Sequence, residues 1–198
     1  RSDVLLLSAD PVIGGDLMLQ SFDLGRTIAA GESVVVNQSV ILPGGLVGAR
    51  YLVVEANVGN RVFELVTNNN VAIANQPLTL LNPDLIVETF TASANAQFGQ
   101  SIHLTWVVRN IGAATANVNW SDRLYLSTNP SSLAGAEVLL TEPALRWLPA
   151  GAGYTNSQPV PLPLGVSRLP GGYFLVVRTD HTGVQPESDE ANNLTFQP

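Results

Sequence analysis

The sequence has no cysteine and no lysine, and only 13% of its residues are charged. The absence of cysteine excludes disulfide bonds, thiolate metal ligands and a cysteine nucleophile. All nine basic residues are arginines, and sixteen acidic residues bring the formal net charge to −7. Phosphate binding requires clustered positive charge, so this balance predicts no nucleic-acid partner. No apolar run approaches the roughly 18 residues of a membrane span, which predicts no membrane insertion.

The chain does contain an internal repeat with an offset of about 120 positions. The matching blocks are 2–11 with 121–130, 27–43 with 147–163, and 48–70 with 171–193. The first block has six identities in ten positions, and the three blocks keep their order. The offset grows only in stretches rich in glycine and proline, where insertions are tolerated. A period of this length fits a whole domain rather than a solenoid repeat.

The repeat places a domain boundary near residue 82, where Asn-Pro-Asp is typical of a break between two strands. We therefore divide the chain into a first domain, 1–82, and a second, nearly complete domain, 83–198. Residues 83–119 have no counterpart in the first copy. We expect the first domain to be the C-terminal two-thirds of the repeat and incomplete as a folded unit. Either the chain is a segment of a longer array, which we favour, or a neighbouring subunit supplies the missing strands.

Alternation of apolar and polar residues predicts an all-β fold. In one strand Ile102, Leu104, Trp106 and Val108 alternate with more polar residues and form the inward row. The segment 154–162 forms a second such row, and its counterpart 34–42 predicts the same strand in the first copy, with Gln158 and Gln38 facing inward. Further expected strands are 85–92, 116–127, 138–141, 172–179 and 193–196. About seven strands without a long helix are typical of a β-sandwich.

Several separated landmarks resemble the CARDB domain, the cell-adhesion-related domain found in bacteria. They are Pro83-Asp84-Leu85, the run 120–127, Leu148-Pro149-Ala150-Gly151, Gly172-Tyr173-Phe174-Leu175 and the closing run 187–193. The resemblance spans 83–198 and, less strongly, 2–82. It implies tandem immunoglobulin-like β-sandwiches, usually carried by large secreted or surface proteins, with no catalytic motif.

The two histidines give little support for catalysis. His103 falls on the outward row of a strand, and His181 follows Asp180 in a turn where we expect it to be solvated. A Ser-His-Asp arrangement would require a serine facing His181 and a separate carboxylate to orient it. The sequence also has no phosphate-binding loop of the GxxxxGK type. We therefore expect a protein that is not an enzyme.

One acidic cluster suggests a calcium site, the single cofactor that the sequence indicates. Its members are Asp180, Glu187, Asp189 and Glu190, accompanied by Asn192 and Asn193. Calcium takes about six to eight oxygen ligands, which such a loop between strands can offer. The alternative is that these residues form turns and are solvated. The first copy favours this alternative, because its equivalent run 57–70 keeps one carboxylate.

Two classes of function fit these features. The first is a structural or adhesive repeat module of a secreted or cell-surface bacterial protein, part of an extracellular fibre, filament or adhesin stalk. Its partners would be copies of itself or adjacent repeats of the same chain. The second is a ligand-binding sandwich that contacts a surface glycan or a protein through its loops. Trp147 is the candidate for an exposed contact, whereas Trp106 and Trp120 fall on inward rows and are expected in the core.

Overall fold

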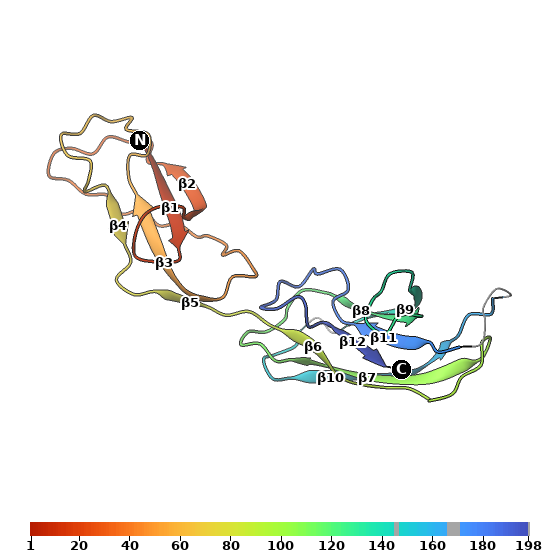
Figure 1. Cartoon of the computed structure of the whole chain (residues 1–198). Coiled ribbons are helices and arrows are strands. Elements are labelled where there is room, and N and C mark those ends of the chain that lie inside the picture. Colours follow the sequence, from red (N-terminus) through yellow and green to blue (C-terminus); the bar gives the residue numbers. More distant parts are fainter. Residues whose placement is uncertain (145–146, 166–170, 198) are drawn as a thin grey trace. The chain divides into compact units, whose positions relative to one another are not determined.

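The computed structural model describes residues 1–144, 147–165 and 171–197, and every regular element in these ranges is a β-strand (Figure 1). The antiparallel sheets confirm the all-β, immunoglobulin-like fold class. The chain divides into two compact units, Arg1–Leu80 and Leu81–Pro198. In the described ranges no helix has the length and apolar character that a membrane span needs.

The described residues of the second unit form seven strands in two antiparallel sheets. The strands are β6 (Leu85–Thr91), β7 (Ser101–Asn110), β8 (Ser121–Ser127), β9 (Glu137–Pro143), β10 (Gly153–Pro161), β11 (Phe174–Arg178) and β12 (Leu194–Gln197). One sheet has the order β10-β7-β6, and the other has the order β12-β11-β8-β9. Figure 1 shows the two sheets of this unit as the layers of a sandwich.

The apolar core of this sandwich lies where the sequence places the inward rows. The row on β7 is buried, and Trp106 and Trp120 are 0% and 4% exposed, which confirms both as core residues. Tyr154, on β10, is half-buried and packs against the same core. The alternation of β7 and β10 follows from the pleat, which turns successive side chains to opposite faces of a sheet.

A buried hydrogen-bond network joins the two sheets through Asp122, which is fully buried on β8. Trp106 Nε1 donates to Asp122 Oδ2 at 2.7 Å, and the Tyr154 hydroxyl donates to the same carboxylate at 2.8 Å. Trp120 Nε1 donates to the Tyr154 hydroxyl at 3.2 Å. Burial raises the pKa of Asp122, and the hydrogen bonds from Trp106 and Tyr154 oppose that shift. The sequence pattern gave no signal that this carboxylate ties the sheets together.

The expected strand 116–127 is shorter in the structure and begins at Ser121. Ala116 forms only an isolated bridge with Leu148. The side chain of Gln185 explains the interruption, because its Oε1 accepts hydrogen bonds from the backbone N–H groups of Asn117 and Val118. A backbone donor that bonds to a side chain is lost to the ladder of the sheet.

The described residues of the first unit form five strands. They are β1 (Ser2–Ser8), β2 (Leu17–Asp23), β3 (Gly48–Glu55), β4 (Val71–Ile73) and β5 (Leu78–Leu80). Their order is β2-β1-β3-β4, and β5 also pairs with β3. This order corresponds to β9-β8-β11-β12 in the second unit.

The two four-stranded arrangements also share their register. Val53 on β3 pairs with Leu6 and Ile73, and Val176 on β11 pairs with Tyr125 and Phe196. These residues correspond under the offsets of the sequence repeat, 119 for Leu6 and Tyr125 and 123 for the others. Each arrangement has a register shift at the same place, between Leu5 and Leu6 in one unit and Leu124 and Tyr125 in the other.

The strand expected over 34–42 is wrong, because the structure has no strand there. Its counterpart β10 is a strand because it pairs along its length with β7, from Gly153↔Arg109 to Pro161↔Ser101. The described residues of the first unit contain no strand equivalent to β7. Without a partner strand, residues 34–42 cannot form the backbone hydrogen bonds of a sheet, despite their alternating pattern. Gln38, which was expected to face inward, is exposed.

The face of the first sheet that corresponds to the core is therefore less covered. Val54 is 39% exposed, whereas its counterpart Val177 in the second unit is fully buried. Leu5 is half-buried, whereas its counterpart Leu124 is 1% exposed. The same strands thus bury less apolar surface in the first unit than in the second.

Candidate functional site

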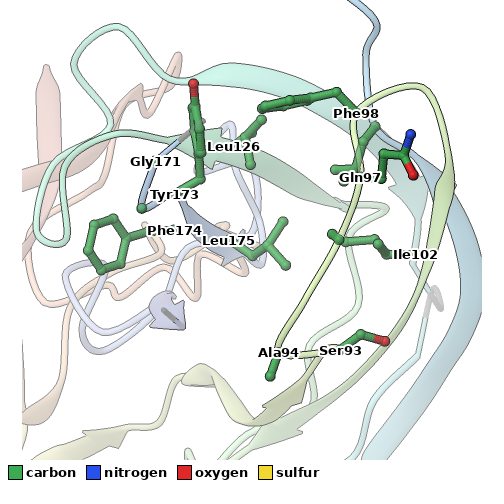
Figure 2. Close-up of a pocket in the computed structure, with 13 residues that line it drawn as sticks. Ser93, Ala94, Gln97, Phe98, Ile102, Leu126, Gly171, Tyr173, Phe174 and Leu175 are labelled. Atoms are coloured by element: carbon green, nitrogen blue, oxygen red, sulfur yellow. The ribbon is translucent and has the colours of Figure 1, made fainter. Parts of the chain in front are cut away.

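Two features lie at opposite ends of β11 in the second unit. At its N-terminal end is a mainly apolar pocket of about 650 Å³, between the loop that follows β6 and the start of β11 (Figure 2). Its lining residues are Ser93, Ala94, Ala96, Gln97, Phe98, Ile102, Leu126, Leu162, Gly171, Gly172, Tyr173, Phe174 and Leu175. None of these side chains is charged. At the C-terminal end of β11 is the acidic loop, residues 180–193, which leads into β12.

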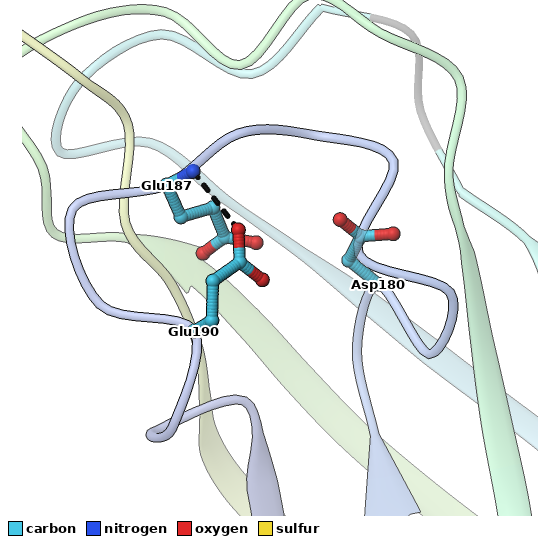
Figure 3. A group of neighbouring side chains, drawn as sticks. All are labelled: Asp180, Glu187 and Glu190. Atoms are coloured by element: carbon cyan, nitrogen blue, oxygen red, sulfur yellow. Dashed lines mark hydrogen bonds between the residues drawn. The ribbon is translucent and has the colours of Figure 1, made fainter. Parts of the chain in front are cut away.

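The acidic loop brings together three of the four residues that the sequence proposed as calcium ligands. Carboxylate oxygens of Asp180, Glu187 and Glu190 all lie within 4.8 Å of one another (Figure 3). Asp189 is not part of this group, and its Oδ1 accepts a hydrogen bond from the N–H of Ala191 at 2.8 Å.

The carboxylates of the group also shape the loop. Asp180 accepts hydrogen bonds from the backbone N–H groups of Val184 at 3.1 Å and Gln185 at 2.8 Å. Its φ of 36° lies in the left-handed region, which aspartate and asparagine adopt more readily than most residues. Glu190 Oε1 accepts a hydrogen bond from the N–H of Glu187 at 3.1 Å. These contacts are those of turn-forming residues, and each carboxylate keeps lone pairs for a further partner.

The surroundings of Glu187 shift its pKa. Its side chain is buried and accepts hydrogen bonds from the backbone N–H of Leu85 and from Asn193 Nδ2, the latter at 3.1 Å. Burial raises the pKa of Glu187 to about 8, and the negative charges of Glu190 and Asp180 add to the shift. The two hydrogen bonds oppose it. At neutral pH this carboxyl group is therefore largely protonated.

The first unit contains the same loop with the opposite electrostatics. Asn57 occupies the position of Asp180, with a left-handed φ of 55°, and Glu64 occupies the position of Glu187. Asn70 Nδ2 and Asn57 Nδ2 donate to Glu64 Oε2 at 2.7 and 3.0 Å. These two hydrogen bonds, that from Asn70 foremost, lower the pKa of Glu64. Asn57 in place of Asp180 and Thr67 in place of Glu190 thus accompany a reversal of the shift.

The acidic loop also holds the connector, which we define as the residues Leu81–Asp84 between β5 and β6. The N–H of Ser188 donates to the carbonyl of Pro83 at 2.9 Å. The Ser188 hydroxyl donates to Asp84 Oδ2 at 3.1 Å, and Asn192 Nδ2 donates to Asp84 Oδ1 at 2.7 Å. Asn192 therefore takes part in holding the connector.

The other side of the connector rests on the loop after β7. The carbonyl of Asn82 accepts hydrogen bonds from the N–H groups of Ala113 and Ala114 at 3.0 and 3.1 Å. A Cβ added at Gly112 would lie 2.4 Å from the carbonyl carbon of Pro83 and 2.5 Å from the nitrogen of Asp84. Only glycine permits this close approach of two backbones.

His181 is half-buried and not solvated as expected. Its Nδ1 lies 3.1 Å from both the carbonyl oxygen and the hydroxyl of Ser121. A carbonyl only accepts, so the hydrogen-bond geometry assigns a proton to Nδ1, which then cannot accept the proton of the Ser121 hydroxyl. His103 Nε2 contacts the Ser157 hydroxyl at 2.9 Å on an exposed sheet face. Trp147 is 66% exposed.

The arrangement of the second unit defines an immunoglobulin-like β-sandwich of two antiparallel sheets. The family model named CARDB matches residues 82–196, more than half of the sequence, so the chain belongs to the CARDB family. This confirms the resemblance found in the sequence. CARDB is a non-catalytic immunoglobulin-like fold, which indicates a structural or binding module.

Solved structures similar to this chain include the crystal structure of a CARDB domain from Pyrococcus furiosus, in complex with di-metal ions. It is 16% identical with a TM-score of 0.44, over 60% of this chain and 93% of that chain. Another is the β-glucosidase 3B of Thermotoga neapolitana in complex with glucose, 10% identical with a TM-score of 0.33, over 61% of this chain and 16% of that chain. No curated protein matches the chain.

Proposed function

We propose that this chain comprises two successive modules of a structural or adhesive repeat array on a secreted or cell-surface protein. The connector is the observation that carries the proposal. It is only four residues long, so no longer linker separates β5 from β6. Asn82, Pro83 and Asp84 are each hydrogen-bonded to loops of the second unit. A linker held in this way transmits force and orientation between modules, which a flexible linker does not.

The shared register supports the modular part of this proposal. Two sheets with the same order, pairing and bulge position occur in one chain, as expected for repeated modules. The partners of such a module are the adjacent repeats or further copies of the chain. Neither the second unit nor the first needs a catalytic group for this role, and the His181–Ser121 contact has the wrong tautomer for one.

The test measures the spread of distances between the two units. Cysteine pairs introduced at exposed positions, Asp23→Cys and Thr155→Cys, accept spin labels without interference because the chain has no cysteine of its own. We expect a narrow distance distribution for the wild-type background. Gly112→Ala should broaden it by forcing the connector off its loop, whereas Gly171→Ala, at a position where an added Cβ meets nothing within 4 Å, should not. A distribution in the wild-type background as broad as that with a Gly-Ser insertion after Leu81 would contradict the proposal.

We also propose that the acidic loop takes a hard divalent cation such as calcium. Asp180, Glu187 and Glu190 offer converging carboxylates, and the buried Asn193, which contacts Glu187 through Nδ2, has an Oδ1 without a hydrogen-bond partner among the described residues. Calcium favours such oxygen ligands, and it would displace the proton that Glu187 holds near neutral pH. A cation here would stiffen the loop that holds the connector.

Calcium titration into the chelator-treated chain tests this second proposal. The denaturation midpoint of the second unit, followed by tryptophan fluorescence, should rise with calcium, since a ligand that binds only the folded state stabilises it. Asp180→Asn should weaken the response, and Asp189→Asn, outside the group, should preserve it. A midpoint that millimolar calcium leaves unchanged would exclude the site.

A further inference from the structure

The outer face of the sheet β12-β11-β8-β9 carries two arginines side by side. Arg123 on β8 and Arg178 on β11 face each other in the ladder of these two strands, which are the inner strands of the sheet (Figure 1). Their neighbours in sequence, Leu124 and Val177, belong to the apolar core, so both arginines lie on the outward side. Like charges directly opposite each other on two strands destabilise a sheet.

In the described ranges no carboxylate forms an ion pair with either arginine. The two ion pairs found there involve other arginines, Arg1 and Arg109. The residues outside the described ranges include no aspartate or glutamate. Arg123 Nε donates to the Thr141 hydroxyl at 3.1 Å, a neutral partner that leaves its charge uncompensated. The outer face thus has a local concentration of positive charge in a chain whose net charge is −7.

The first unit shows that the sheet does not require these arginines. Val4 on β1 and Glu55 on β3 face each other and correspond to Arg123 and Arg178 under the repeat. The same register therefore forms with one apolar and one acidic residue at the two positions. A pair of cations that costs stability, and that the sheet can form without, indicates a functional role.

An aromatic row lies beside the arginines on the same face. Tyr125 on β8 and Phe196 on β12 flank Val176 of β11, two residues along the strands from the arginine pair. Val176 is fully buried although it is not part of the apolar core between the sheets, so neighbouring groups on the outer face cover it. The rings of Tyr125 and Phe196 are half-buried. Two residues along a strand span about 7 Å, which separates the cationic row from the aromatic row.

We propose that this face binds an acidic polysaccharide, a polymer of sugars that carry carboxylates. The planar guanidinium groups of Arg123 and Arg178 fit carboxylates bidentately. The negative faces of the aromatic rings attract the C–H groups of a sugar ring. One sugar ring with its carboxylate spans the distance between the two rows. Such a polymer would reach the arginines on a secreted or cell-surface protein, so the site rests on the function proposed above.

The position of the arginines favours a polysaccharide over an acidic peptide. An extended peptide gains affinity by adding a strand to a free sheet edge. The backbones of β8 and β11 are each paired on both sides, so this face offers side chains alone. A polysaccharide is recognised through its carboxylates and ring faces and needs no backbone ladder.

The test uses the full chain and a fluorescently labelled oligomer of galacturonic acid, followed by fluorescence polarisation. We expect saturable binding that weakens as the salt concentration rises. Arg178→Gln should reduce the affinity by about tenfold or more, because a hydrogen bond between charged groups is lost. Arg109→Gln, which removes the same charge from the other sheet, should bind as the wild type does. Arg123→Val with Arg178→Glu, which copies the pair of the first unit, should abolish binding and keep the unfolding midpoint, measured by tryptophan fluorescence.

Two further comparisons separate the charge from the rings. The methyl ester of the same oligomer has no carboxylate charge and should not bind. Tyr125→Leu, which copies Leu6 of the first unit, should weaken binding and leave its salt dependence unchanged.

Absence of saturable binding, equal binding of the methyl ester, or wild-type affinity of Arg178→Gln would overturn the proposal. Equal affinity for polyglutamate would assign the arginines to an acidic peptide. Concentration-dependent association of the chain that Arg178→Gln abolishes would assign them to a second copy, and either result overturns the polysaccharide. The spin-label distances test the repeat function separately, so either proposal can fail alone.

Discussion

Replacing Asp180 by asparagine should move the electrostatics of the acidic loop in the second unit towards those of the first. In the first unit Asn57 Oδ1 accepts the hydrogen bond from the N–H of Val62 at 3.0 Å, and Asn57 Nδ2 donates to Glu64. Asp180 accepts the equivalent hydrogen bond, from the N–H of Gln185. Asp180→Asn keeps this acceptor, removes one negative charge beside Glu187 and adds a donor. The pKa of Glu187 should therefore fall.

The sign of the pH dependence follows from the direction of the shift. The pKa of Glu187 is about 8 in the folded protein and 4.5 for an unperturbed glutamate, so the folded state holds the proton more tightly. The second unit is therefore most stable, as far as Glu187 is concerned, below about pH 4.5, and it loses stability as the pH rises through 8. The full difference would be roughly 5 kcal/mol at about 1.4 kcal/mol per pKa unit. Screening by solvent at the loop surface reduces this to about 2 kcal/mol.

Urea denaturation of the chelator-treated chain between pH 5 and 8, followed by tryptophan fluorescence, measures this loss. We expect the wild-type second unit to lose about 1.5 kcal/mol across this range, because pH 8 only reaches the folded-state pKa of Glu187, and Asp180→Asn to lose about 1 kcal/mol less. Asp180→Asn loses the hydrogen bond from the N–H of Val184, and this loss lowers its stability by the same amount at every pH. The comparison therefore uses the slope of the free energy of unfolding against pH. Asp189→Asn should have the wild-type slope. Parallel pH profiles of the free energy of unfolding for Asp180→Asn and wild type would refute the conclusion that the charge of Asp180 helps to raise the pKa of Glu187.

Three further predictions address stability and exposure. Asp122→Ala should lower the free energy of unfolding of the second unit by about 3 kcal/mol in urea denaturation, because Trp106 Nε1 and the Tyr154 hydroxyl lose their buried hydrogen-bond acceptor. Asp122→Asn, which keeps one oxygen, should cost less. Gly112→Ala should cost about 2 kcal/mol or more by the same measurement, since its Cβ overlaps Pro83; a change within about 0.5 kcal/mol would show that the connector yields. Acrylamide should quench Trp147 and spare the buried tryptophans, so Trp147→Phe should abolish most of the quenching.

The sequence was sufficient for features that depend on one strand at a time. The alternation of 102–108 predicted a buried row because period two alone decides which side chains face inward. It was insufficient where the partner strand decides the outcome, as in 34–42, which has the pattern of β10 without a β7 to pair with. The same limit applies to the site. The acidic residues were visible in the sequence, but the turn that separates Asp189 from Asp180 and the contact of Glu187 with Leu85 depend on the fold.

The matching sheets of the two units bear on the order of folding. In the first unit the arrangement β2-β1-β3-β4 reaches the register and bulge of β9-β8-β11-β12 although the described residues provide no opposing sheet. The strand pattern and the turns that fix a register are shared by the two units. The corresponding sheet of the second unit can form as a cooperative unit before β6, β7 and β10 dock on it. Hydrogen exchange should then find the amides of β8 and β11 protected first during refolding, and those of β10 later.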